Sequence, residues 1–379
     1  MSVADAPRLT ALIEEAQRVL SICNACRYCE GYCAVFPALQ RRLAFDESDV
    51  HYLANLCHNC GACLYACQYA PPHPFEVNFP QLLANVRKRS YARYAWPNAL
   101  ASAFERNGTV VAIVTMASIA ALLLFTAWYA NPVRFFSAHS DAEGSFYAVM
   151  PHGVMSTMFV VVSAFVVLAL GVSFGRFWRD TGERRSELAS PGTLRGAVRD
   201  SASLTYLDGA GEGCRTENAS PSSMRRIFHH LTFYGFLLCF AATVIGTIYH
   251  YGFGWQAPYP FFSMPVVLGT IGGVGLLAGP AGLWWLKRRR DRDLVDRTQD
   301  GMDAGFLVLL FVTSLTGLLL LALRETRSMG VMLALHLGAV MALFLTLPYG
   351  KFVHALYRFA ALLRFHRELR RPSQVSRSE

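Results

Sequence analysis

The N-terminal part of the chain contains the same cysteine pattern twice. CNACRYCEGYCAVFP, from Cys23 to Pro37, and CHNCGACLYACQYAP, from Cys57 to Pro71, both read C-x2-C-x2-C-x3-C-x3-P. Three cysteines at two-residue gaps, followed by a fourth after three residues, form the ligand run that binds a cubane iron-sulfur cluster. Two such runs predict a module that carries two 4Fe-4S clusters and moves electrons.

The fourth cysteine of each run is expected to serve the other cluster, as it does in two-cluster ferredoxins. This predicts two crossed sets of thiolate ligands. The sets are Cys23, Cys26, Cys29 and Cys67 for one cluster, and Cys57, Cys60, Cys63 and Cys33 for the other. An alternative is a pair of four-cysteine zinc sites, but structural zinc usually takes separated C-x2-C pairs joined by a longer loop. The spacing favours iron and sulfide.

The rest of the chain is apolar enough to lie in lipid. Of the 379 residues, 53% are hydrophobic and 16% are charged, and the mean hydropathy is +0.30. Runs of about 20 apolar residues, the length that crosses a bilayer, occur near 108–130, 151–175, 227–250, 263–286, 304–323 and 331–357. We predict a mainly α-helical protein: an α-helical two-cluster ferredoxin-like domain (1–95), then a six-helix transmembrane bundle (96–379).

The distribution of Lys and Arg predicts the orientation in the membrane, because these residues accumulate in cytoplasmic segments. They are concentrated after the second span, after the fourth span and in the C-terminal tail, whereas the opposite loops carry only Arg134, Arg324 and Arg327. No apolar signal core precedes the cysteines. We therefore expect a bacterial inner-membrane protein with both termini in the reducing cytoplasm. The net charge of +9 comes from cations that flank apolar spans, which indicates membrane anchoring rather than nucleic-acid binding.

Two connecting segments have their own patterns. Residues 75–95 are basic, end before Pro97, and favour a helix at the membrane interface. The cytoplasmic loop 179–225 is rich in Gly, Ser and Arg and has no clear period. Loops of this length are usually functional or disordered, so we expect it to dock on or cover the iron-sulfur domain.

Histidines in apolar spans are costly unless they have a function. Six lie near the ends of the expected spans: His152, His229, His230, His250, His336 and His354. His336 and His354 are eighteen positions apart, which is five whole turns of a continuous helix, so they would share a face at opposite depths, as for two stacked haems. Around the axis of the third span, His229 is offset from His250 by about 60°, whereas His230 is offset by about 160°. This favours His229 over His230 as a haem ligand.

Matching the depths predicts two pairs of haem ligands. His229 pairs with His354 at the inner end, and His250 pairs with His336 at the outer end, each pair able to bind a b-type haem. His152 competes for the outer site. Any single interfacial histidine could equally well be there because its polar end stays hydrated among the lipid headgroups. The depth-matched set, however, predicts one or two haems. The glycine-rich stretch 269–282 lies in a span and has no preceding strand, so it predicts close helix packing rather than a dinucleotide site.

These residues resemble the citrate/tricarballylate utilisation protein B family over nearly the whole chain. The resemblance is carried by both cysteine runs, by SLTYLDGAGEGC (203–214), by HHLTFYGFLLCFAATVIGTIYH (229–250) and by LPYGKFVHALYRF (347–359). The last element also resembles the haem-bearing end of nitrate reductase gamma-type subunits, where His336 and His354 would correspond to ligands. One departure from bacterial ferredoxins is that proline follows the fourth cysteine only after three residues.

The resemblance implies a redox subunit that reoxidises the reduced FAD of a fumarate-reductase-like partner, tricarballylate dehydrogenase, and passes the electrons to membrane quinone. The residues independently predict a path from two clusters through haem to quinone. No Ser-His-Asp set, paired carboxylates or flavin-type glycine loop appears, so we expect no catalytic residue for an organic substrate on this oxidoreductase subunit. Alternatives are a membrane subunit of another dehydrogenase or of a heterodisulfide-type reductase, and an iron-sulfur redox sensor or transporter, which the scarcity of acids in the spans disfavours.

Overall fold

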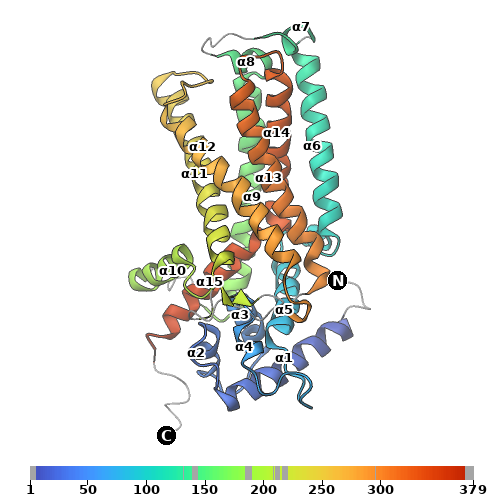
Figure 1. The fold of residues 1–379 in the computed structure, drawn as a ribbon, viewed down its shortest axis with the longest axis vertical. Helices are drawn as coiled ribbons and strands as arrows, with labels where there is room; N and C mark the ends of the chain where they lie inside the picture. Colours follow the sequence, from blue (N-terminus) through green and yellow to red (C-terminus); the bar gives the residue numbers. More distant parts are fainter. Residues whose placement is uncertain are drawn as a thin grey trace.

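The computed structural model describes residues 6–130, 132–138, 144–183, 190–207, 209, 214–215, 221–294 and 296–371. Long helices form a bundle that stands on a layer of shorter N-terminal helices (Figure 1). The described strands are β1 (Cys214–Arg215) and β2 (Pro221–Ser222), which pair antiparallel. The mainly α-helical fold is therefore confirmed. We call the end of the bundle next to the N-terminal layer the inner end and the opposite end the outer end.

The N-terminal layer holds each cysteine loop between helices. Its helices are α1 (Ala6–Cys26), α2 (Val35–Leu39), α3 (Glu47–Leu56), α4 (Ala62–Tyr65), α5 (Phe79–Tyr94) and the 3-10 helix η1 (Asn98–Phe104). The Asp46 carboxylate caps α3 by accepting from the Asp49 amide at 2.7 Å, which satisfies a free N–H of the first turn. Leu20, Leu53 and Leu83 are fully buried between these helices, and each burial stabilises the layer by about 2 kcal/mol.

Six helices are long and apolar enough to cross a membrane, as predicted. They are α6 (Asn107–Tyr129), α9 (His152–Asp180), α11 (Met224–Phe253), α12 (Met264–Arg288), α13 (Asp300–Leu323, with the 3-10 turn η4, Arg297–Gln299, before it) and α14 (Met329–Thr346). The short elements α7 (Pro132–Phe135), α8 (Ser145–Val149) and η3 (Arg292–Leu294) connect them. The protein thus has the helices of a multi-pass membrane protein.

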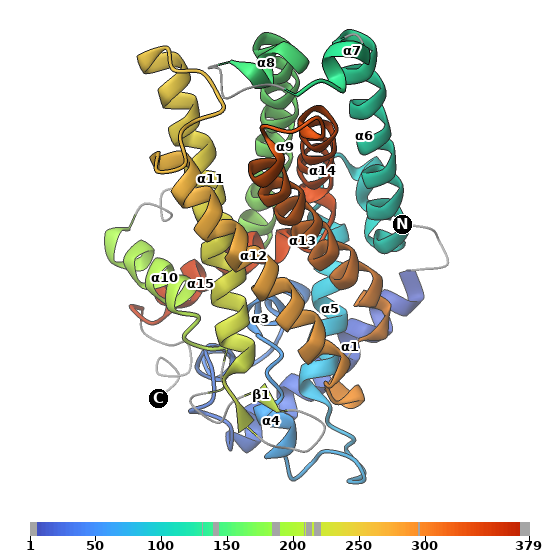
Figure 2. The same ribbon diagram turned by 45° about the horizontal axis from the view of Figure 1, so that its top comes forward.

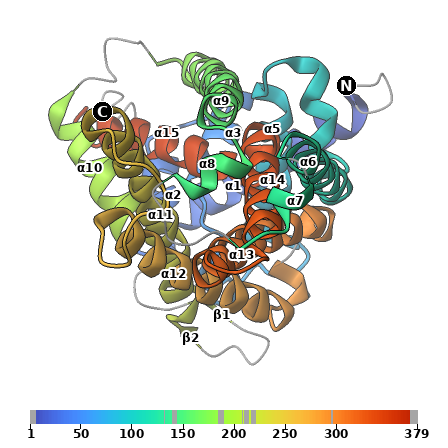
Figure 3. The ribbon, with the colours of Figure 1, turned by 90° about the horizontal axis from the view of Figure 1, so that it is seen from above.

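The expected continuous span 331–357 was wrong. Helix α14 ends at Thr346, the 3-10 turn η5 (Leu347–Tyr349) follows, and a separate helix, α15 (Val353–Glu368), begins after the extended Gly350. Pro348 lacks the N–H that a continuing helix needs and its ring clashes with the preceding turn. Figure 3 shows α15 lying across the bundle instead of along it. His336 and His354 are therefore on different helices, and the five-turn argument does not apply to them.

One hydrophobic core joins the N-terminal layer to the inner end of the bundle. It includes residues from α1, α3 and α5 together with Phe177 of α9 and Tyr357 of α15. The rings of Tyr91 and Tyr357 stack with centroids 5.7 Å apart, and Tyr94 meets Phe177 edge to face at 5.3 Å. Helix α5 is therefore packed into this core instead of lying on the membrane interface, as its basic composition had predicted, and its Arg87 is buried.

The glycine-rich stretch of α12 packs directly on α11. A Cβ added to Gly272 would lie 2.7 Å from the Gly235 carbonyl oxygen, and one added to Gly279 would lie 2.4 Å from the Thr232 hydroxyl. The two backbones approach this closely only because the side chains are missing. The prediction of close helix packing for residues 269–282 is confirmed.

The described part of the loop 179–225 contains a helix that the sequence pattern did not reveal. Helix α10 (Pro191–Ser203) packs on α15 (Figure 2), where Asp200 Oδ2 lies 2.7 Å from His366 Nε2. Leu207, just after this helix, is buried. The segment therefore covers α15, and residues 184–189, 208, 210–213 and 216–220 lie outside the described residues.

A buried ion-pair network fastens the end of α15 to the N-terminal layer. Glu368 accepts from Arg42, from Arg364 Nε at 2.9 Å and from the Tyr52 hydroxyl at 3.1 Å. Asp49 lies 2.7 Å from Arg42 and 2.9 Å from Arg364. Burial acts to raise the pKa of Glu368, but the charges of Arg42 and Arg364 outweigh it and hold this pKa below its ordinary value.

We expect Glu368→Gln to lower the melting temperature of the detergent-solubilised protein by several degrees, because it removes the carboxylate that two buried guanidinium groups share, at a cost of about 3 kcal/mol. A group with a lowered native pKa stabilises the fold above its unfolded pKa and loses that effect as pH falls through the native value. The deficit should therefore be complete at neutral pH and shrink only in acid. Glu14→Gln, on the exposed face of α1, is the control, and equal melting temperatures would contradict the role of Glu368.

Candidate functional site

The structure groups the eight cysteines of the two runs into two sets of four. Cys67 lies beside Cys23, Cys26 and Cys29, and burial together with the charges of these neighbours raises the pKa of Cys23 to about 12. Cys33 lies beside Cys57 and Cys60, and burial and the charges of both raise its pKa well above the ordinary value. Cys63 interacts with the same three thiols. Each set thus combines three cysteines of one run with the fourth cysteine of the other.

These crowded thiols suit a group that brings several positive metal ions. A cavity of about 30 Å³ lies between Cys23, Cys26, Cys29, Cys63 and Cys67. A cubane spreads its four thiolates over separate irons, and the donor set fits it.

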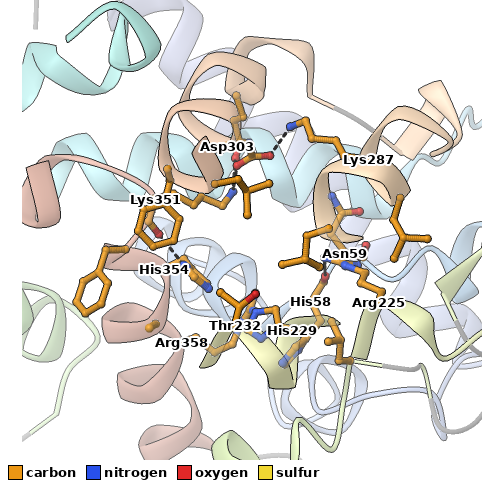
Figure 4. A pocket seen from close by; sticks show the side chains of 18 of the residues that line it. His58, Asn59, Arg225, His229, Thr232, Lys287, Asp303, Lys351, His354 and Arg358 are labelled. Atoms are coloured by element: carbon orange, nitrogen blue, oxygen red, sulfur yellow. Dashed lines mark hydrogen bonds and ion pairs between the residues drawn. The ribbon is translucent and has the colours of Figure 1, made fainter. Parts of the chain in front are cut away.

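A larger cavity, of about 270 Å³, lies at the inner end of the bundle (Figure 4). Helices α5, α11, α12, α13 and α15 enclose it, and His58 and Asn59 of the second cysteine loop close it from the N-terminal side. We call it the inner cavity. Apolar side chains line its bundle side, among them Phe236, Leu283 and Phe306.

Two of the predicted histidines meet at the inner cavity. The rings of His229, from α11, and His354, from α15, have centroids 6.1 Å apart and planes at 79°. His354 Nδ1 lies 2.5 Å from the Lys351 carbonyl oxygen, to which it donates, so that Nε2 keeps its lone pair. Burial, then the charges of Arg358 and Lys351, hold the pKa of His354 well below its ordinary value. His230 is not among the residues that line the cavity.

The pair fits an iron ion held from both sides. When two imidazoles bind the same metal ion from opposite sides, each with a metal–nitrogen distance of about 2 Å, their ring centroids lie roughly 6 Å apart. His229 Nδ1 is buried with no hydrogen-bond partner among the described residues. Both observations suit the axial ligands of a b-type haem.

The wall of the inner cavity carries more positive than negative charge. Its cations are Arg87, Arg225, Lys287, Arg290, Lys351 and Arg358, and its carboxylates are Asp296 and Asp303. An excess of buried cations suits an anionic group such as the two propionates of a haem.

Four of these arginines also hold the second cysteine loop. Arg358 Nη2 donates to the Cys57 carbonyl at 2.7 Å, and Arg225 Nη1 donates to the Asn59 carbonyl at 2.9 Å. Arg87 donates to the Cys57 carbonyl and Arg290 to that of Asn59. The backbone next to the second cysteine set therefore forms part of the wall of the inner cavity, together with His229 and His354.

The predicted outer pair, His250 with His336, is not brought together. His250 stacks on His152, with ring centroids 3.6 Å apart and planes at 18°. His336 Nδ1 lies 3.1 Å from the Thr313 carbonyl and 3.2 Å from the Thr316 hydroxyl, both on α13. Figure 1 shows α11 and α12 leaning away from α13 and α14 toward the outer end, because α11 stays packed on α12. His152, which was considered as a competitor, takes the place expected for His336.

Several residues of the inner cavity were missed from the sequence. From the sequence, four of its arginines are simply cations that flank apolar spans: Arg87, Arg225, Arg290 and Arg358. Their convergence depends on how α5, α11, α15 and the turn after α12 pack together. Asp303 directly precedes the apolar run 304–323, so the sequence alone does not distinguish it from the other charges that flank the spans.

Comparisons with known proteins agree with this architecture. The family model for the Fer4-like domain of citrate utilization protein B matches residues 16–93, and the model for citrate utilization protein B matches residues 106–375. Citrate utilization protein B of Escherichia coli is 50% identical over 377 residues, which cover 98% of this chain and 97% of that protein. No solved structure matches.

The fold and the site define a membrane protein in which a ferredoxin-like domain is joined to six apolar helices. Within that class, the chain belongs to the citrate utilization protein B family.

The cysteine grouping predicts that single substitutions damage one cluster each. Cys67→Ser should remove the cluster bound by Cys23, Cys26 and Cys29, and Cys33→Ser should remove the other, each lowering the iron and acid-labile sulfide content by about half. Electron paramagnetic resonance of the dithionite-reduced protein should then lose a different signal in each variant. Cys239→Ser, inside α11, is the control. Loss of the same signal in both variants would contradict the crossed grouping.

Proposed function

We propose that this protein is the membrane electron-transfer subunit of a citrate or tricarballylate utilisation system. It takes electrons from a partner dehydrogenase through two 4Fe-4S clusters and haem b, and delivers them to membrane quinone. The observation that carries the proposal is the meeting of His229, His354 and the second cysteine loop at the inner cavity.

The two cysteine sets give the path a direction. Tyr28, beside the first set, is 67% exposed, whereas Cys57 of the second set is 6% exposed and next in sequence to His58, which lines the inner cavity. Electrons therefore enter at the exposed set and leave through the buried one. The four arginines hold that loop against the wall that contains the histidine pair.

His229 and His354 would hold the iron of a haem, which supplies a one-electron carrier when bound. The Lys351 carbonyl keeps the His354 ring in the tautomer that leaves Nε2 free to bind a metal. Arg225 and Arg358 would balance the charge of the propionates. Phe236 and Phe306 exclude water from the bundle side.

The partner and the location follow from the family resemblance and the charge distribution. The resemblance favours the reduced FAD of a fumarate-reductase-like tricarballylate dehydrogenase as the electron donor. The positive-inside pattern supports the bacterial inner membrane with both termini in the cytoplasm, where such a donor would reach the exposed cysteine set. Another dehydrogenase or a heterodisulfide-type reductase as partner would use the same path.

A second class, an iron-sulfur redox sensor or transporter, is distinguished by the haem. A sensor needs the clusters alone, so reduced protein without b-type absorbance bands would favour it. Reoxidation of both clusters and haem by a quinone analogue would support electron transfer.

We expect His354→Ala to abolish the b-type absorbance bands of the dithionite-reduced protein, because it removes one axial ligand, while the broad iron-sulfur absorbance is retained. His230→Ala is the matched control, since His230 is the sequence neighbour of His229 but does not line the inner cavity. Unchanged haem bands in His354→Ala, or their loss in His230→Ala, would refute the assignment.

A further inference from the structure

A half-buried group of opposite charges lines the inner cavity on the side away from His229. The Lys287 Nζ of α12 lies 2.5 Å from Asp303 Oδ2, and the Lys351 Nζ, just before α15, lies 2.7 Å from Asp303 Oδ1. Figure 4 shows this group across the cavity from Thr232 and His229. We call Lys287, Asp303 and Lys351 the ion-pair group.

The ion-pair group is costly where it stands, which indicates a function. Asp303 lies within the helix α13 that is expected to enter the membrane, and ionisable groups there are rare unless they serve a ligand or a proton path. The side chains of Lys287 and Lys351 keep 22% of their surface exposed and Asp303 keeps 25%, and all three line the inner cavity. A ligand in the cavity can therefore contact them.

The group is connected to the protein surface by other polar side chains. Lys287 Nζ also lies 2.9 Å from Asp300 Oδ1, and the Asp300 side chain is 50% exposed. On the other side, Lys351 Nζ lies 3.4 Å from Gln299 Oε1, and Gln299 Nε2 donates to Asp296 at 2.9 Å. Protons can thus reach the cavity from the inner surface in two short steps, through Asp300 and Lys287.

The remaining wall beside the ion-pair group is apolar. Leu283, Leu286, Phe306, Leu307 and Leu310, from α12 and α13, line the same cavity. A flat, uncharged ring with a hydrocarbon tail matches such a wall, and two polar oxygens on the ring match the lysines. The arginines beside the second cysteine loop suit haem propionates better than Lys287 and Lys351 do. Asp303 and Asp300 already balance much of the positive charge of these two lysines.

We propose that the ion-pair group binds the head group of a membrane quinone and supplies the protons for its reduction. This inference rests on the proposed function, in which the quinone is the electron acceptor. Lys351 donates a hydrogen bond to one carbonyl oxygen of the quinone, and Asp303 positions both lysines.

The reduction balances with the groups present. A quinone gains two electrons, delivered singly from the histidine side of the cavity, and two protons, one on each carbonyl oxygen. Its two C=O groups become C–OH groups and the ring becomes aromatic. Lys351 and Lys287 lose the protons, and the chain through Asp300 returns them from the inner surface.

The test measures binding separately from turnover. The probe is a heptyl-hydroxyquinoline N-oxide, a fluorescent quinol analogue, titrated into purified wild-type protein and into Asp303→Asn and Lys351→Met. We expect each variant to keep its haem and cluster spectra and to bind the probe at least about tenfold more weakly, the effect of losing one charge-assisted hydrogen bond. Reoxidation of the pre-reduced haem by a short-chain quinone should slow in parallel.

Lys88→Met is the matched control, because Lys88 donates to the Thr298 carbonyl at 2.9 Å and does not line the cavity. Asp303→Glu, which retains the charge, should restore most of the binding even where Asp303→Asn lowers protein yield. Wild-type affinity in both test variants would overturn the proposal. Loss of haem from them would overturn it as well, because the lysines would then bind propionates. Absence of haem from the wild-type protein would instead refute the proposed function.

Discussion

The structure depends on a set of guanidinium-to-carbonyl hydrogen bonds at the second cysteine loop. Arg87, Arg225 and Arg358 come from α5, α11 and α15, and Arg290 lies just after α12. All four donate to carbonyls in residues 57–59. Charge-assisted bonds of this kind are among the stronger ones in proteins. They tie the cysteine loop to the helix bundle.

This connection matters because the proposed function gives the two parts different roles. In that proposal the N-terminal layer presents one cysteine set to a partner dehydrogenase, and the apolar side of the inner cavity keeps water away from the haem. Helix α15 connects the N-terminal layer to the bundle. It shares a hydrophobic core with α5 and α9, places His354 at the inner cavity, and ends in the Glu368 ion-pair network. The cations of the cavity wall are hydrogen-bonded, the four arginines to backbone carbonyls of the cysteine loop and the two lysines to Asp303.

The local patterns predicted the elements well. The six apolar runs were found as six long helices, the glycine-rich stretch was confirmed as a close helix contact, and the preference for His229 over His230 agrees with the lining of the inner cavity. Such predictions need only spacing and hydropathy. The expected pair of His250 with His336 failed because it assumed parallel helices, and His250 in fact stacks on His152.

The sequence by itself determined which residues are able to bind metals and which segments are apolar, because cysteine spacing and hydrophobic length are properties of the chain. Only the tertiary structure decided which of them meet. Pro348 ends α14 and turns α15 across the bundle, and that turn brings His354 to His229 and Lys351 to Asp303. The direction of a helix after a break is set by packing against distant segments, which no local pattern contains.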